Sequence, residues 1–122
     1  MSISRFDGLL VSSSLVGETP AIAMNGMNAL SITLTSPVVS TTTSFLLTLF
    51  RSDDAINWTS FASMTLTPSP TAGAPYAAAA SAGRTGQLAP QGALTSAYVK
   101  LKLTTTSTQT GSFSMIVNSA ID

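Results

Sequence analysis

The sequence predicts an all-β fold over residues 1–122: a single antiparallel β-sandwich of jelly-roll or immunoglobulin-like type, or a small barrel. Three observations support this prediction. Apolar residues recur at every second position in several short runs. Turn-forming residues separate these runs. Residues that favour helix on exposed faces are scarce, because the chain has one Glu and two Lys against many Ser and Thr.

Five alternating runs predict the stronger strands. Their buried faces, in chain order, are Leu30, Ile32 and Leu34; Phe45, Leu47 and Leu49; Ala62, Met64 and Leu66; Val99, Leu101 and Leu103; and Phe113, Met115 and Val117. Weaker patterns predict strands near 8–15 and 21–24. The run 45–50 is apolar on both faces, so we expect it at the centre of a sheet or at a subunit contact.

Turn signals lie between the runs. Asn25-Gly26 fits a tight hairpin turn, because both residues tolerate positive φ. Ser36-Pro37 and Asp53-Asp54 also interrupt the alternation. The residues Gln109-Thr110-Gly111 predict a closing hairpin that pairs a strand at 97–106 with one at 112–119.

Residues 68–93 are rich in Ala, Pro and Gly, and they predict one long loop or arm. Within it, 76–82 is mostly Ala and could form a helical turn or two, although isolated helices that short are marginal. Two interpretations remain open at this point. The segment is either a surface insertion or an arm that orders against a neighbouring subunit, and its uncharged composition favours the arm.

The chain carries little charge. Only 8% of its residues are charged, with five basic and five acidic side chains, against about 25% in an ordinary domain. A net charge of zero and a mean hydropathy of +0.38 favour association with other subunits. With equal numbers of basic and acidic side chains, the sequence shows no excess of positive charge of the kind that binds nucleic acid. We also expect no secretory signal and no membrane span.

The sequence offers little for catalysis or metal binding. It contains no His and no Cys, so a Ser nucleophile lacks its usual base and zinc lacks its usual ligands. Asp53, Asp54 and Asn57 could ligate calcium, but a turn that bonds its own backbone is the favoured interpretation. Lys100 and Lys102 alternate with core residues and should face solvent or a partner. We therefore predict no enzyme, no cofactor and no metal site.

The most distinctive stretch is Ser52-Asp53-Asp54-Ala55-Ile56-Asn57-Trp58. It resembles the S-x-D-G-x-x-W strand–turn–strand element of discoidin-like carbohydrate-binding domains and small phage virion proteins, with Ala55 where Gly is usual. The run Ala97-Tyr98-Val99-Lys100 resembles the Y-V-R strand of such modules, with Lys in place of Arg. The resemblance covers about 45–117 and implies a β-sandwich. Discoidin-like modules bind ligands through loop aromatics and arginines, a role here open to Trp58, Tyr76, Arg51 and Arg84. For Trp58 itself, packing in the core or against the hairpin is the favoured interpretation.

These observations predict a non-enzymatic structural protein of a virus particle, such as a phage capsid decoration, cement or minor capsid protein. The alternatives are a self-polymerising filament or surface-layer subunit at the cell exterior, and a carbohydrate-binding or adhesion module. The expected partners are copies of the chain itself or a major capsid protein, with a glycan as the lesser alternative and with no nucleic acid and no membrane. The residues predicted to contact a partner are Leu9, Leu10, Val11, Leu46, Phe50, Tyr76, Arg84 and Leu88.

Overall fold

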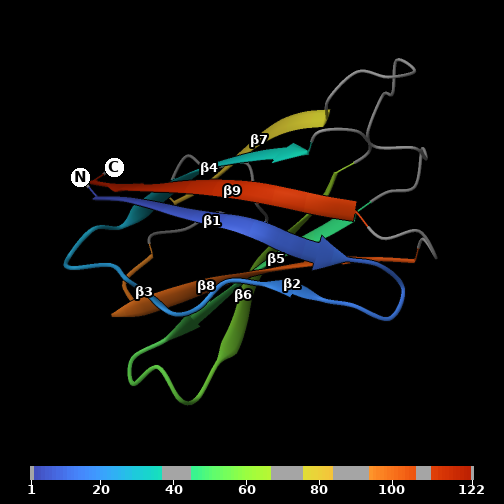
Figure 1. Cartoon of the computed structure of the whole chain (residues 1–122). Coiled ribbons are helices and arrows are strands. Elements are labelled where there is room, and N and C mark those ends of the chain that lie inside the picture. The colour runs from blue at the N-terminus through green and yellow to red at the C-terminus, as the bar shows by residue number, and fades with distance from the viewer. Residues whose placement is uncertain (1, 37–44, 67–75, 84–93, 107–110, 122) are drawn as a thin grey trace.

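A computed structural model describes residues 2–36, 45–66, 76–83, 94–106 and 111–121 (Figure 1). Within these ranges all regular structure is β-strand. The strands are β1 (Ser2–Val11), β2 (Gly17–Glu18), β3 (Ile22–Ala23), β4 (Ala29–Ser36), β5 (Phe45–Ser52), β6 (Thr59–Leu66), β7 (Tyr76–Ala82), β8 (Tyr98–Thr105) and β9 (Gly111–Ala120). The described residues contain no helix that is long and apolar enough to cross a membrane.

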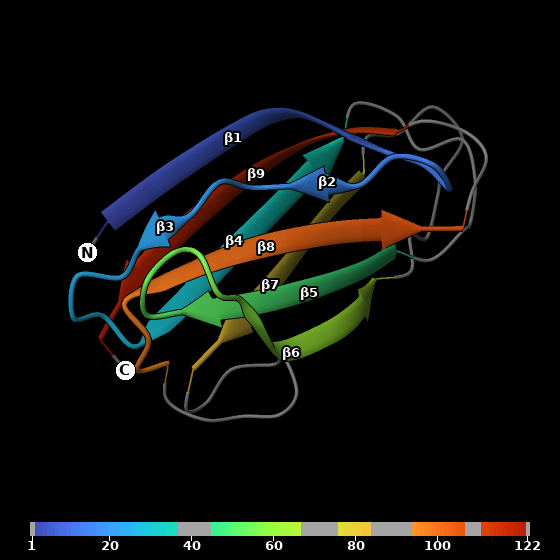
Figure 2. The same ribbon diagram turned by 90° about the horizontal axis from the view of Figure 1, so that it is seen from below.

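The strands form two antiparallel sheets that pack face to face (Figure 2). One sheet has the order β1-β9-β4-β7, and the other has the order β2-β8-β5-β6, with β3 also paired to β8. The chain changes sheet at every connection except β2–β3 and β5–β6. This alternation is the jelly-roll arrangement. The predicted β-sandwich is therefore confirmed, and of the alternatives the jelly roll fits the strand order.

The core lies between the two sheets and is built from the predicted alternations. Strand β8 shows the pattern most clearly, because Val99, Leu101 and Leu103 are fully buried while the residues between them are half-buried. Across the interface, the rings of Phe45 and Phe113 meet edge to face with centroids 5.0 Å apart. These two residues come from different sheets, so their contact joins the layers.

Two predicted hairpins are wrong, although the strands that flank them exist. Strand β8 pairs with β5, whereas β9 lies in the other sheet between β1 and β4. Likewise, β3 and β4 lie in different sheets. The turn between them does form as predicted, with positive φ at Asn25 and Gly26 and a 2.9 Å bond from the Met27 N–H to the Met24 carbonyl. Alternation identifies the buried face of a strand, but it carries no information on which strand lies beside it.

The predicted loop or arm at 68–93 contains a strand of the sandwich. Strand β7 pairs with β4 in unbroken register, from Leu30 opposite Ala82 to Ser36 opposite Tyr76. The helical turns considered for 76–82 do not form, because pairing to β4 outweighs the helix preference of alanine. Two of the alanines, Ala80 and Ala82, are buried against the core. The rest of 68–93, apart from Gly83, lies outside the described residues.

The first strand begins earlier than predicted. It starts at Ser2 and pairs with β9, with a shift of register between Phe6 and Leu9. Gly8, which lies within this irregularity, has φ of 70°. The interruption hides the alternation in the sequence, which explains why the pattern predicts only a weaker strand near 8–15.

Candidate functional site

The turn between β5 and β6 holds itself together through one carboxylate. Asp54 Oδ1 accepts bonds from the Ile56 and Asn57 N–H groups at 2.9 and 2.8 Å, and Asn57 Nδ2 donates to Asp54 Oδ2 at 2.7 Å. The Ser52 hydroxyl donates to Asp54 Oδ1 at 2.8 Å. These bonds, those from Asn57 and Ile56 above all, hold the pKa of Asp54 far below its usual value. The calcium alternative loses support, because the turn itself uses the Asp54 oxygens.

The S-x-D-x-x-x-W motif therefore folds as a self-bonded turn. Ala55 has φ of 62°, a left-handed conformation that favours glycine. This is the position where the resembling modules carry Gly. The strain at Ala55 is offset by the bond from its N–H to the Ser52 hydroxyl oxygen at 3.0 Å. Among the described residues, no group of three or more acidic side chains could hold a metal ion.

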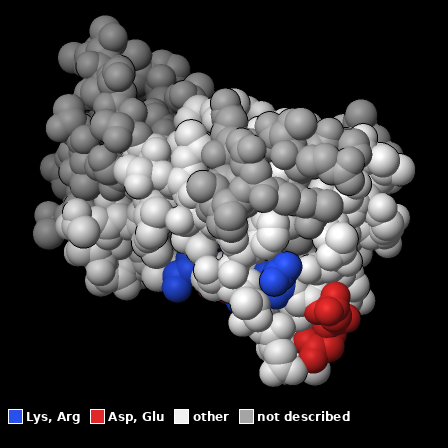
Figure 3. All heavy atoms as spheres, turned by 180° about the vertical axis from the view of Figure 1, so that it is seen from behind, with Lys and Arg blue, Asp and Glu red and all other residues white. Residues whose placement is uncertain are grey.

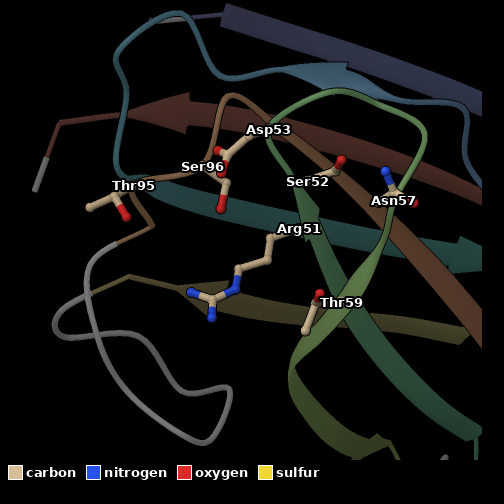
Figure 4. A pocket seen from close by; sticks show the side chains of 7 residues that line it. All are labelled: Arg51, Ser52, Asp53, Asn57, Thr59, Thr95 and Ser96. Atoms are coloured by element: carbon tan, nitrogen blue, oxygen red, sulfur yellow. The ribbon is translucent and has the colours of Figure 1, made fainter.

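Beside this turn lies an open polar pocket of about 380 Å³ (Figure 4). Its lining combines one guanidinium, one carboxylate, one amide and several hydroxyls. The residues are Arg51, Ser52, Asp53, Asn57, Thr59, Thr95 and Ser96. The Asp53 carboxylate accepts the Ala97 N–H at 3.3 Å, and the Arg51 guanidinium lies 5.2 Å from the centre of the Phe61 ring. Such a lining can bind a polar ligand by hydrogen bonds.

On the outer face of the β2-β8-β5-β6 sheet, two lysine ammonium groups lie over aromatic rings. The Lys100 ammonium lies 4.7 Å from the centre of the Trp58 ring and 5.7 Å from that of Phe50. It also binds Glu18 Oε1 at 2.7 Å. The Lys102 ammonium lies 6.0 Å from the centre of the Phe50 ring. Trp58 is half-buried and its ring is covered by Lys100, in line with a packing role for this residue.

The predicted contact residues do not form one surface. Leu10 is 50% exposed on β1, and Leu46 is 42% exposed on β5 of the opposite sheet. Leu46 lines a second hollow of about 450 Å³, together with Phe45 and threonines of β6 and of the end of β8. Phe50 is half-buried on the same face as Leu46 and contacts both lysines of β8.

Val11 is wrong as a contact residue, because it is fully buried and belongs to the core of this chain. Leu9 is half-buried and packs against that core. Tyr76 begins strand β7, and Arg84 and Leu88 lie outside the described residues.

The sequence patterns did not predict several of the exposed apolar side chains. Ile3 is 68% exposed on β1, and Ile56 is 79% exposed at the tip of the β5–β6 turn. Alternation within Ser2–Val11 would have placed Ile3 outside, but the irregularity at Gly8 concealed its phase. Leu15 and Val16 also lie largely exposed beyond the end of β1.

No family model matches the sequence, and no curated protein is significantly similar to it. Solved structures do share its fold. The PBSX exported protein XepA superposes with a TM-score of 0.63 at 11% identity over 99% of this chain. The mitogen derived from Yersinia pseudotuberculosis superposes with a TM-score of 0.50 at 18% identity, over 99% of this chain and 87% of the mitogen. This chain spans 37% of the length of XepA. At these identities the similarities show the jelly-roll sandwich as the fold.

Proposed function

We propose that this chain is a non-enzymatic structural protein of a virus particle, a capsid decoration or minor capsid protein that binds neighbouring subunits. One observation carries the proposal, namely the outer face of the β1-β9-β4-β7 sheet, which we call the uncharged face because its charged side chains among the described residues form one neutral ion pair. On β4 this face presents Ser31, Thr33 and Thr35, all exposed. Apolar Ile3 and Leu10 extend the same face along β1, opposite Asn118 and Ser112 of β9.

The few charges on this face are neutralised within the chain. Among the described residues it carries Arg5 and Asp7, whose side chains form an ion pair at 3.1 Å. A hydrogen bond from Ser114, and then one from Arg5, lower the pKa of Asp7 below its usual value. Figure 3 shows another side of the molecule, where the charged side chains of the described residues are likewise confined to small groups.

Such a face suits burial against a subunit. Placing a charge in an interface carries a large desolvation cost unless the charge is paired, and hydroxyls carry a smaller one that new hydrogen bonds offset. Apolar contacts add about 25 cal/mol per Å² buried. A modest contact repeated by the symmetry of a particle then gives firm attachment. The likeness in fold to a phage-derived exported protein supports a viral or surface role in general terms.

The test is the mass of the purified protein by light scattering, with negative-stain images of the same sample. A monomer or a small discrete oligomer that sediments with preformed capsids is the expected result. Filaments or sheets formed by the protein alone would contradict the proposal and favour a self-polymerising subunit.

A sugar-binding role has one observation in its favour, the polar pocket beside Arg51 and Asp53. Its hydroxyl, amide, guanidinium and carboxylate groups suit a neutral, strongly hydrated ligand. The pocket lacks the exposed aromatic platform that would strengthen this role, because Trp58 is not among its lining residues. Screening of the wild type and of an Arg51→Ala variant on a glycan array tests it. Binding by the wild type that the variant loses would favour the sugar-binding role.

A further inference from the structure

The polar pocket beside the β5–β6 turn contains a cation and an anion that do not pair with each other. Arg51 and Asp53 both line this pocket, and both side chains are exposed. In the described part of the chain, neither of them takes part in an ion pair. Opposite charges at close range attract each other strongly away from bulk water. Here separate contacts within the chain hold each charged group in its own place.

The Arg51 side chain is positioned by the edge strand β6. A register shift where β6 meets β5 leaves Phe61 without a residue directly opposite it. The Arg51 guanidinium lies 5.2 Å from the centre of the Phe61 ring. Attraction between the cation and the ring restricts the orientation of the side chain, and strand irregularities are frequent beside binding sites, where they direct side chains. The guanidinium is thus held without a carboxylate of the described residues, and its N–H groups remain available to a ligand.

The Asp53 carboxylate is positioned by the segment that precedes β8. Asp53 Oδ1 accepts the N–H of Ala97 at 3.3 Å, a bond between residues 44 positions apart in the sequence. A carboxylate has about four acceptor positions, so this bond leaves most of them open. In Figure 4 the Asp53 carboxylate and the Arg51 guanidinium lie in different parts of the pocket. The pocket therefore presents a fixed anion and a fixed cation at separate points.

We propose that this pocket binds a small zwitterion, a free amino acid or a dipeptide, with its carboxylate on Arg51 and its ammonium on Asp53. Charge complementarity argues for this occupant, because a neutral ligand would use neither charge fully and an ion of one sign would oppose one of them. A guanidinium also matches the planar geometry of a carboxylate. Both protein groups are held in place before binding, which reduces the entropy lost on binding. The inference goes beyond the proposed role in a virus particle and is independent of it.

The size and the uncharged groups of the pocket suit the same ligand. A volume of about 380 Å³ lies near the lower end of the range for small-molecule sites, which favours a ligand with few atoms. Thr59, Thr95 and Ser96 bring hydroxyl groups to the lining. A hydroxyl can donate to a carbonyl oxygen or accept from an N–H, so it can bond either group of a peptide unit. The Ser52 hydroxyl is already engaged within the β5–β6 turn.

A titration with glycylglycine, followed by NMR chemical shifts of the isotope-labelled protein, tests the pocket directly. Glycylglycine carries both charges and no side chain. N-acetyl-glycylglycine lacks the ammonium, and glycylglycine amide lacks the carboxylate. We expect shifts at the backbone amides of Asn57, Thr95 and Ser96, with a dissociation constant on the order of 1 mM. Each blocked form should bind about tenfold more weakly, because it loses a hydrogen bond between charged groups.

Two substitutions assign the charges of the ligand to the two side chains. Arg51→Gln should abolish the preference for glycylglycine over its amide and keep the preference over the acetylated form. Asp53→Asn should do the reverse, and the amide oxygen of the new side chain can still accept the Ala97 N–H. The matched control is Lys102→Gln, which removes a cation of the same sheet outside the pocket and should bind like the wild type. A merely structural role of either residue would not exchange the two preferences.

The outcomes separate this inference from the proposed function. Three results would each overturn the zwitterion site: no shifts of the pocket amides at about 10 mM glycylglycine, equal binding of the blocked forms, or unchanged preferences in the two variants. Shifts of the same amides with glucose but not with glycylglycine would also overturn it and would favour the sugar-binding role. Sedimentation with capsids tests the proposed role separately, because that role rests on the outer face of the other sheet.

Discussion

The outer faces of the two sheets satisfy their polar groups in different ways. On the β2-β8-β5-β6 sheet, the Lys100 ammonium is bound by Glu18 and covers Trp58 within the same chain. On the β1-β9-β4-β7 sheet, exposed threonines of β4 present hydroxyls, and the charged side chains among the described residues of this sheet are confined to the Arg5–Asp7 pair on the edge strand β1. Contacts within the same chain stabilise the first face. The second face presents hydroxyl groups that a neighbouring subunit could bind. The two outer faces therefore differ in how they place their few charges, and the proposed function assigns the contact with a neighbouring subunit to the second face.

The largest expected effect comes from breaking the core that both faces share. Leu101 is fully buried on β8, so Leu101→Asp places an unpaired carboxylate between the sheets. We expect a loss of more than about 4 kcal/mol, enough to prevent folding. Circular dichroism and a thermal melt measure this effect. A folded Leu101→Asp variant would contradict the assignment of this strand face to the core.

A smaller effect is expected from removing the Lys100 ammonium from the outer face of the β2-β8-β5-β6 sheet. Lys100→Ala deletes the bond to Glu18 and the contact with Trp58, and should lower the free energy of unfolding by about 1–2 kcal/mol. Trp58 fluorescence should shift as the ring becomes more exposed. Lys102→Ala, which loses a longer contact with Phe50, is the matched control and should change both quantities less.

The β5–β6 turn should make stability depend on acid pH. The carboxylate of Asp54 has a pKa far below its ordinary 3.8 in the folded chain, because the turn N–H groups bond its charged form. Its contribution is therefore fully present above pH 3.8 and is lost progressively as the pH falls below that value. Denaturant melts between about pH 6 and pH 2 measure the slope. Asp54→Asn should flatten it, whereas Ile56→Ala at the exposed tip of the turn should leave it unchanged.

The smallest effect on stability is expected on the uncharged face. Thr33→Lys should change the free energy of unfolding by less than about 0.5 kcal/mol, because Thr33 is exposed. The same variant should weaken sedimentation with capsids, since the lysine would be buried unpaired in the contact. Equal capsid binding by the variant and the wild type would indicate that another surface makes the contact, and would remove the proposed difference between the two faces.

The sequence allowed the buried faces to be predicted well and the strand pairing poorly. Leu30, Val99 and Phe113 lie in the core as their alternation predicts, because burial on one face imposes a period of two. The partners of β8 and β9 could not be predicted from this period, since either sheet accepts the same pattern. Strand β7 escaped detection because a run of alanines alternates in burial without alternating in residue type.

Among the residues predicted to contact a partner, exposure could be predicted where apolar residues alternate regularly between buried and exposed positions along a strand. Leu46 alternates with the buried Phe45 and Leu47 and lies outside, as expected. Val11 was misplaced because the register shift between Phe6 and Leu9 changes the phase of β1, and nothing in the residue types marks that shift apart from Gly8. The polar pocket combines the β5–β6 turn with Thr95 and Ser96, residues distant in sequence that only the folded chain brings together.

The position of β9 has a consequence for how the chain folds. This strand is the last in chain order, yet it lies between β1 and β4 and pairs with both. During folding, the sheet that contains β1 and β4 can close only once β9 has joined them. The pairing of β1 with β9 joins residues more than 100 positions apart, for example Ser2 and Ser119, and contacts this distant in sequence form slowly. Until then the apolar sides of both strands depend on transient contacts or on chaperones to avoid aggregation.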